Sequence, residues 1–562
     1  MVLIDILKIV ASPFVRVRTL LEKFQVNSLI TNLGLLLKPW IPANAKGAWF
    51  LWNRKPSCII NTKMCTMKPK FLAVIILAVA TAAMALTFSI PDSKNRIPSS
   101  WEKAWKQVDS LKEIGQPKSA LELVNALSKR ATNEDNQPQL IKALLYRFAL
   151  KSSFEENYEE QAILEAKQAL IDAKEPVKQL LHSILADLYQ SYYQSNRWRV
   201  LNRTKLQSDV SQDIKTWDAS VFYDTIHWNY QHSLQHPDAL AKIKVRDFLP
   251  ILDTGRSSAL YRPSLLDLLA HRAILYYQND ESGISKSIAE FELDNPDYFG
   301  DDETFTKIRL KDLKAVGPKR ELLECYQTLA KAHQNDEDKT AAVYTQLQRL
   351  EFVHNNATLY YADSLYVNTL TQLSTDYKSH EISAWIAYYL ATFYQNQPEP
   401  TSDLKRVEAI CKEAIARFPK SDGALNCSDL LTNLYRQNLS LQTPEAIYPG
   451  NPLLLSVSWQ NCKELYVKVL RLNFEDWEAR HEQNQDALVK RYLKHKPVQE
   501  IHQKLDGELD FKNHTSELAI NGLSSGYYLI IASSNPKFNF TESPVSYTTF
   551  YSTRLSARTK SA

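Results

Sequence analysis

Glycine is scarce in this chain. Only 12 of its 562 residues are glycine, about 2% against a usual figure of about 7%. Leu, Ala, Gln, Lys and Glu are abundant between Pro91 and Leu441, which favours helices. Phosphate-binding loops need glycine because their backbone approaches the phosphate closely, and neither G-x-G-x-x-G nor G-x-x-x-x-G-K-[ST] occurs. The common nucleotide-binding motifs are therefore absent.

Motifs of catalytic and metal sites are missing as well. His481-Glu482 lacks the second histidine of H-E-x-x-H, and there is no C-x-x-C. Gly522–Gly526 fits G-x-S-x-G, but a nucleophile elbow leads from a strand into a helix, and the YYLIIAS that follows predicts a strand, so we interpret these residues as a hairpin turn. The acidic Gly300–Glu303 lacks the ligand spacing of a calcium loop and is interpreted as solvated surface. We name no catalytic, cofactor-binding or metal-binding residue and expect no enzyme and no cofactor.

Cysteine is rare, with six in the whole chain. The four that follow Ala85 are too few for a disulfide-built scaffold, so we expect most to be buried thiols. A bond between two of them in an oxidising compartment stays open, because spacing in the sequence does not establish one. The four are Cys325, Cys411, Cys427 and Cys462, and Cys411 with Cys427 is the pair in question.

Positive charge is concentrated at the start of the chain. The net charge is +4, but residues 1–70 hold 11 Lys or Arg against Asp5 and Glu22. The remaining residues carry 56 basic and 61 acidic side chains. A nucleic-acid partner is not expected, because the main part of the chain lacks the basic excess that would attract phosphates.

An export signal is predicted at residues 67–85. Met67–Lys70 is basic, and Phe71–Phe88 is a run of eighteen residues without charge that contains Ala83 and Ala85 at the spacing a signal peptidase reads. The mature chain is then expected to begin at Leu86 and to be exported to the periplasm or cell envelope, or secreted. No cysteine directly follows the apolar run, so lipidation there is not supported.

Residues 1–66 have few acids and no sustained apolar period. We interpret them as a disordered upstream extension ahead of a true start at Met67 or Met64. An organellar transit peptide is also basic and acid-poor, and 71–88 could remain as an uncleaved anchor, since about 18 apolar residues barely cross a bilayer. Contact with a membrane is expected only through that segment if it is uncleaved.

Helical pairs are predicted between residues 100 and 441. The spacing of Leu111, Gly115, Ala120, Val124 and Leu127 provides an apolar residue, a turn glycine, a small residue at a helix crossing and two further apolar contacts. It resembles one tetratricopeptide repeat. A small residue at the crossing lets two helices approach, and larger side chains fill the groove to the next pair.

Partial matches to the same pattern follow. They are interrupted at Gln397–Ser402 and at the acidic Asp294–Glu303, so we expect an irregular array of roughly seven to ten helical pairs. The matching residues are Ala330, His333 and Ala342, then Ala391 and Tyr394, and then Cys411, Ala414 and Pro419.

Aromatic residues are frequent in this helical region. A ligand-binding aromatic groove is one use for them, but their helical spacing favours packing between repeats. His271 is likewise interpreted as a hydrogen-bonded interior histidine and not as a metal ligand. The aromatic residues in question are Tyr189, Tyr192, Tyr193, Trp198, Trp217, Trp228, Tyr276, Tyr277, Tyr388 and Tyr389.

The character of the chain changes after Pro449–Pro452. Leu453–Trp459 and Leu465–Leu472 are short, partly alternating apolar runs on either side of a polar turn, which predicts a strand, a turn and a strand. A charged insertion occupies Glu475–Lys504, and a last strand is expected at Tyr547–Leu555.

A further hairpin is expected near the C-terminal end. Leu518–Ile520 and Tyr527–Ala532 flank Gly522–Gly526, the arrangement of two strands around a turn. The whole segment has the size of one immunoglobulin-like unit of about 105 residues.

A family resemblance rests on these strands. LLLSVSWQNCKELYVKVLRL, LSSGYYLIIAS and YTTFYSTRLS look like an early macroglobulin domain of bacterial alpha-2-macroglobulin-like proteins of the Bacteroidetes type, and YRPSLLDLLAHRAILYY resembles part of their helical N-terminal region. The resemblance covers residues 67–556. It implies protease trapping, in which a bait region is cleaved and, in many members, a thioester between Cys and Gln captures the protease.

The chain departs from a complete member of that family. It contains no C-x-E-Q, and Cys462 is followed by Lys463-Glu464-Leu465, so its thiol lacks a Gln partner at the required spacing. The ARTKSA ending lies where a strand into a next domain is expected. The chain therefore looks like the N-terminal part of a longer or split reading frame.

The predicted fold is mainly α: an irregular tetratricopeptide-like solenoid followed by a small immunoglobulin-like β-sandwich. The predicted function is the N-terminal scaffold of an exported endopeptidase inhibitor, with target proteases or downstream macroglobulin domains as partners. An independent helical adaptor for envelope proteins or peptides is the alternative, and an enzyme with an unrecognised site is the third hypothesis. The expected segments are 1–66 (extension), 67–85 (signal peptide), 100–441 (helical array), 450–556 (β-sandwich) and 557–562 (tail).

Overall fold

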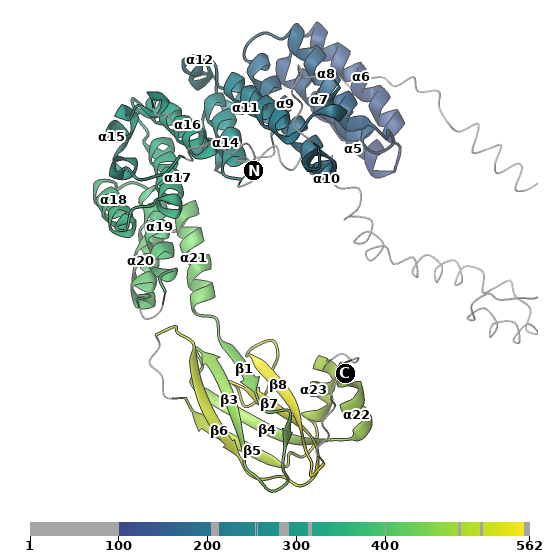
Figure 1. Cartoon of the computed structure of the whole chain (residues 1–562), viewed down its shortest axis with the longest axis vertical. Helices are drawn as coiled ribbons and strands as arrows, with labels where there is room; N and C mark the ends of the chain where they lie inside the picture. Colours follow the sequence, from purple (N-terminus) through teal and green to yellow (C-terminus); the bar gives the residue numbers. More distant parts are fainter. Residues whose placement is uncertain are drawn as a thin grey trace, which may run out of the picture. The chain divides into compact units, whose positions relative to one another are not determined.

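The structure is a computed structural model of the chain. It is mainly helical, with a β-sheet region toward the C-terminal end (Figure 1). Two compact units make up the chain: residues 1–290 with 315–325, and residues 291–314 with 326–562. The predicted extension, signal peptide and tail lie outside the described residues. Those are 100–203, 213–252, 255, 257–279, 291–312, 317–398, 401–481, 485–505 and 510–555.

The described part of the first unit is made of helices. Consecutive long helices pack against one another, as α6 does against α7 and α9 against α11. The elements are α5 (Trp101–Glu113), α6 (Pro117–Asn133), α7 (Gln137–Lys151), α8 (Tyr158–Ile171), α9 (Val177–Ser195), α10 (Arg197–Leu201), η3 (Ile214–Thr216), α11 (Ala219–Ser233), α12 (Pro237–Lys242), η4 (Val245–Ile251), α13 (Ser258–Tyr261) and α14 (Leu265–Tyr277). Helix α16 (Pro318–His333) begins in this unit and ends in the second.

The first helical pair, α5 and α6, forms where the sequence predicts it. Gly115 has φ +75°, a left-handed conformation that ends α5, and Pro117 starts α6 at a position where its missing N–H costs nothing. Ala120, Val124 and Leu127 are all fully buried in the core between α5, α6 and α7. The small side chain of Ala120 is therefore used at a helix crossing, as expected.

Enlarging Ala120 should destabilise this pair. We expect Ala120→Leu to lower the free energy of unfolding by about 1–3 kcal/mol, because a close-packed crossing has no room for three more carbons. Chemical denaturation of the full chain, read by hydrogen exchange of α5 and α6, measures the change. Asn125→Leu on the exposed side of α6 is the matched control, and an equal loss in both variants would contradict the crossing.

Aromatic side chains fill the space between α9 and α11. Tyr189 stacks on Trp217 with ring centroids 5.5 Å apart, and Tyr192 stacks on Phe222 at 5.8 Å. Eight of the ten aromatic residues singled out in the sequence are at least partly buried, which agrees with a packing use. Trp198 and Trp228 are exceptions, being 84% and 48% exposed.

The second unit begins with a short irregular segment and continues with long helices. The last three, α19, α20 and α21, pack against one another around Ala391, Cys411 and Ala414. Ala342 of α17 is only partly buried, and the neighbouring Ala341 occupies the core instead. The elements are η6 (Pro296–Phe299), α15 (Asp302–Lys307), η7 (Leu310–Asp312), α17 (Thr340–Asn356), α18 (Ala362–Asp376), α19 (Ser383–Gln395), α20 (Leu404–Arg417) and α21 (Asp422–Leu434).

The described part of the helical region holds slightly fewer long helices than the seven to ten pairs predicted from the sequence. The described part of residues 100–441 holds thirteen helices of 13 residues or more. Seven helical pairs would need fourteen helices, so the number of long helices lies just below the expected range. The acidic interruption at Asp294–Glu303 holds the 3₁₀ segment η6 and the start of the short helix α15.

The segment at residues 291–312 is anchored by the buried Arg349 of α17. The Arg349 side chain is 1% exposed and donates to the carbonyl oxygens of Tyr298 (2.5 Å) and Gly300 (2.8 Å). Its guanidinium also lies 3.4 Å from the Asp302 carboxylate. Burial raises the pKa of Asp302, and Arg349 acts against that rise. Asp301 and Glu303 are exposed, in agreement with the interpretation as solvated surface, whereas Asp302 is only partly exposed and pairs with Arg349.

Eight strands in the described residues form two sheets (Figure 1). One has the order β1-β3-β6, and the other has the order β2-β8-β7-β4-β5. All pairs are antiparallel except β2 with β8. The strands are β1 (Asn438–Gln442), β2 (Ala446–Ile447), β3 (Leu453–Gln460), β4 (Glu464–Leu472), β5 (Gln499–Lys504), β6 (His514–Ile520), β7 (Gly526–Ser533) and β8 (Val545–Ser552).

The two sheets share one hydrophobic core. Val457 of β3, Val467 of β4, Ile520 of β6 and Ile530 of β7 all belong to it. The chain crosses from one sheet to the other between β3 and β4, and again between β6 and β7. The hairpin expected around Gly522–Gly526 is therefore wrong, because β6 pairs with β3 while β7 pairs with β4 and β8.

The charged insertion covers the outer face of the five-stranded sheet. It contains α22 (Phe474–Glu478), η8 (Ala479–His481), α23 (Gln485–Tyr492) and strand β5. Leu529 and Ile531 of β7 pack against apolar side chains from this insertion, whereas the alternate β7 residues face the shared core. Strand β7 is therefore buried on both faces, and helices occur beyond the expected limit at Leu441.

The helical part and the sheets of the second unit meet directly. Strand β1 starts four residues after α21 and pairs with β3, so strands begin well before Pro452. Asn461 donates through Nδ2 to the carbonyl oxygens of Leu434 (2.8 Å) and Arg436 (3.0 Å). Phe511 is buried in the core of α19, α20 and α21. The residues between the two predicted domains, 442–449, therefore do not form a linker that separates them.

Candidate functional site

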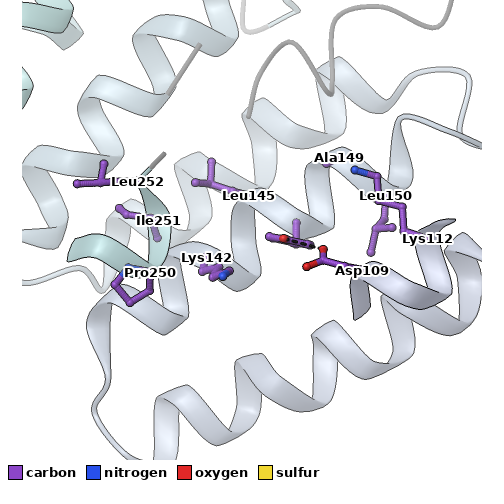
Figure 2. A pocket seen from close by; sticks show the side chains of 10 residues that line it. Asp109, Lys112, Lys142, Leu145, Ala149, Leu150, Pro250, Ile251 and Leu252 are labelled. Atoms are coloured by element: carbon purple, nitrogen blue, oxygen red, sulfur yellow. Dashed lines mark hydrogen bonds between the residues drawn. The ribbon is translucent and has the colours of Figure 1, made fainter. Parts of the chain in front are cut away.

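A cavity of about 270 Å³ lies in the first unit between α5, α7 and η4 (Figure 2). Its wall combines charged and apolar side chains, the usual composition of a small-molecule site. The lining residues are Asp109 and Lys112 of α5, Lys142, Leu145, Tyr146, Ala149 and Leu150 of α7, and Pro250, Ile251 and Leu252 at η4.

Lys142 lies in the middle of this group in Figure 2. Its ammonium is 4.8 Å from the centroid of the Trp105 ring and 5.6 Å from that of Tyr146. Burial lowers the pKa of Lys142, and the charge of Asp109 partly offsets this. Within the described residues Lys142 makes no hydrogen bond or ion pair, so aromatic faces are its main contact.

Asp109 and Tyr146 form a second polar element of the cavity. The Tyr146 hydroxyl donates to Oδ1 of Asp109 at 2.9 Å. Burial, followed by the charge of Asp109, raises the pKa of Tyr146. The phenol is therefore a stable donor that keeps the Asp109 carboxylate oriented.

The end of the cavity beside η4 is apolar. Figure 2 shows Pro250, Ile251 and Leu252 on the far side of Lys142 from Asp109. Ile251 is 2% exposed and contributes to the packing of η4 on α7. The cavity thus has an apolar end and a charged centre, which suits an amphipathic ligand better than a purely polar one.

None of these cavity residues belongs to a motif that the sequence singles out. Lys142 interrupts the run LIKALLYRFAL, in which most other positions are apolar and buried. A lysine within such a run is the signal that could have found the site. The proximity of η4 to α7, about 100 residues apart in the chain, has no local signature.

His271 has the role that the sequence predicts. It is buried, and its Nδ1 lies 2.8 Å from the Asp267 carbonyl oxygen on the same helix. No group of three or more metal-binding side chains occurs within the described residues.

The G-x-S-x-G match is no nucleophile elbow. Ser524 lies between strand β6 and strand β7, so no helix follows it. Its Oγ is 3.2 Å from the Tyr528 hydroxyl. Of the other motif near-misses, the side chain of His481 lies outside the described residues.

All four cysteines that follow Ala85 are buried, free thiols, as expected. Cys411 and Cys427 lie on the neighbouring helices α20 and α21 and belong to the same hydrophobic core. Cys462 donates to the carbonyl oxygens of Gln460 (3.3 Å) and Asn438 (3.4 Å). Burial raises the pKa of Cys462, which disfavours the reactive thiolate.

Neither a protein-family model nor a curated protein matches the chain. Across the described residues, no helix combines the length and the apolar character needed to span a membrane.

Proposed function

We propose that the chain is the N-terminal scaffold of an exported alpha-2-macroglobulin-like endopeptidase inhibitor and that it has no enzymatic activity of its own. In this proposal the helical region is an irregular tetratricopeptide-like array, and the sheets are an immunoglobulin-like macroglobulin sandwich. The observation that carries it is the order of the parts: a long helical region followed by two sheets on a shared core. Strands β3, β4, β7 and β8 overlap the segments that resemble a macroglobulin domain.

The state of Cys462 supports the role of a scaffold over that of a covalent trap. Covalent capture in the family requires an acyl group activated as a thioester. Cys462 lies in the β3–β4 connection, is 3% exposed, and has its thiol directed at two backbone carbonyls. A thiol held in this way is an ordinary structural side chain.

We therefore expect this chain alone to form no covalent adduct with a protease. Incubation with a broad-specificity protease, followed by denaturing electrophoresis, should give cleavage products and no band of higher mass. Methylamine treatment should leave the chain's mass unchanged, because there is no thioester to open. A methylamine-sensitive adduct that disappears in Cys462→Ala would contradict the proposal.

A second function is favoured by the cavity between α5, α7 and η4. An independent helical adaptor for envelope proteins or peptides needs a site of its own on the helices, and this cavity supplies one. Under this hypothesis a soluble ligand should bind the isolated chain, whereas the scaffold hypothesis alone requires no ligand.

A further inference from the structure

We propose that the cavity between α5, α7 and η4 binds a carboxylate attached to an apolar group, with the carboxylate on Lys142 and the apolar group against Ile251 and Leu252. This inference goes beyond the scaffold role and does not depend on it. The same chemistry is found in a short aliphatic acid and in the free carboxyl terminus of a peptide with an apolar last residue.

Lys142 carries an ammonium group that has room for an anionic partner. A partly buried ammonium loses hydration, and that loss is normally offset by an anionic or hydrogen-bonding partner. Among the described residues, the Lys142 ammonium lies near the faces of Trp105 and Tyr146 and within the influence of the Asp109 charge, but it makes no hydrogen bond or ion pair. Those rings hold the ammonium in place and leave its three N–H donors available, so an incoming carboxylate gains charge-assisted hydrogen bonds.

The charges around the cavity favour an anionic ligand. Lys112 and Lys142 line the cavity against a single acid, Asp109, whose Oδ1 already accepts from Tyr146. A cationic ligand would meet two like charges, whereas an anionic ligand meets one. The carboxylate is therefore favoured on the side of Lys142 away from Asp109, which is the side of η4 in Figure 2.

The size of the cavity limits the ligand to a small group. At about 270 Å³ the cavity is just below the range of about 300–1,000 Å³ that is usual for small-molecule pockets. It suits a single apolar residue or a short acyl chain and not a folded partner. Leu145, Pro250, Ile251 and Leu252 provide the apolar contacts.

Ligand-detected NMR titration of the full chain tests this inference. Butanoate, hexanoate and N-acetyl-leucyl-leucine are the probes, with the amide of the peptide as the uncharged comparison. We expect dissociation constants of about 1 mM or tighter for hexanoate or the free peptide. Lengthening the acid should strengthen binding about threefold to fourfold for each methylene, and the amide should bind at least tenfold more weakly.

Two variants and one control assign the carboxylate to Lys142. Lys142→Gln should weaken binding of the acids at least tenfold, whereas Asp109→Asn should strengthen it about twofold because a like charge is removed. Lys129→Gln, an exposed lysine of α6, should change nothing. Circular dichroism checks that each variant is folded. If Lys142→Gln does not fold, the change in acid affinity of Asp109→Asn tests the placement of the carboxylate.

Binding of hexanoate without the peptide would identify a small acid as the source, and binding of the peptide alone would identify a chain terminus. No binding of either at about 10 mM, equal binding of the amide, or a loss of affinity in Asp109→Asn would overturn the inference.

Discussion

Replacing Arg349 by methionine should lower the free energy of unfolding of the second unit by about 3–5 kcal/mol, the usual cost of removing one partner from a buried charged network. The guanidinium satisfies the carbonyl oxygens of Tyr298 and Gly300 and pairs with Asp302. It also lies 4.2 Å from the centroid of the Phe305 ring. Methionine keeps the apolar contact and leaves those oxygens without their donor.

Hydrogen exchange locates the damage. Protection should fall first in η6 and α15, which Arg349 ties to α17, and less in α19 to α21. Arg309→Met is the matched control, because Arg309 is an arginine of the same segment whose side chain is 86% exposed and whose contact with Asp312 is long at 3.8 Å. Its effect should stay within about 0.5 kcal/mol. Comparable losses in the two variants would refute the anchoring role of Arg349.

Adding a single methyl group at Gly423 should destabilise the last helices by about 1–3 kcal/mol or more. A Cβ at Gly423 would lie 2.5 Å from the Ala384 carbonyl carbon and closer still to the Trp385 nitrogen. Both are backbone atoms of α19, so no side chain can rotate away, and α21 must shift. In an open helix interior the same change would stabilise by about 1 kcal/mol, so the sign of the effect is decisive.

The thermal midpoint of the second unit measures the effect of Gly423→Ala. Ser428→Ala on the exposed side of α21 is the control, with an expected gain of a few tenths of a kcal/mol, roughly. A stabilised Gly423→Ala variant would show that α19 and α21 do not approach as closely as the structure has them.

The helical region shows which residues at helix–helix contacts can be predicted from the sequence. Ala120 and Ala414 were found because each lies within a local pattern of turn, small residue and apolar contacts, and both are buried. Gly423 was missed because its close neighbour is on α19, two helices earlier in the chain. Arg349 was missed because an arginine on a helix is usually solvated, and only the packing of 291–312 onto α17 makes it a buried donor.

The pairing of the strands and the position of the cavity could not be predicted from the sequence, for a similar reason. Period-two alternation located most of the strands, including β3, β4, β6 and β7. It could not assign partners, since a five-residue connection at 521–525 suits either a hairpin or a crossing between sheets. Strand β1 was assigned to the helical region although Leu439 and Leu441 alternate with polar residues. The cavity depends on the approach of η4 to α7, which no local pattern encodes.

Phe511 connects the sheets to the core of the last three helices. A stack of helices normally needs a terminal repeat with a polar outer face, because its last apolar groove otherwise meets water. Here Phe511 and its ring contact with Tyr435, at 5.6 Å, fill that place from the sheet side. The sheet side thus covers the last apolar surface of α19, α20 and α21, and shortening the protein after Leu434 would expose that surface to water and favour aggregation.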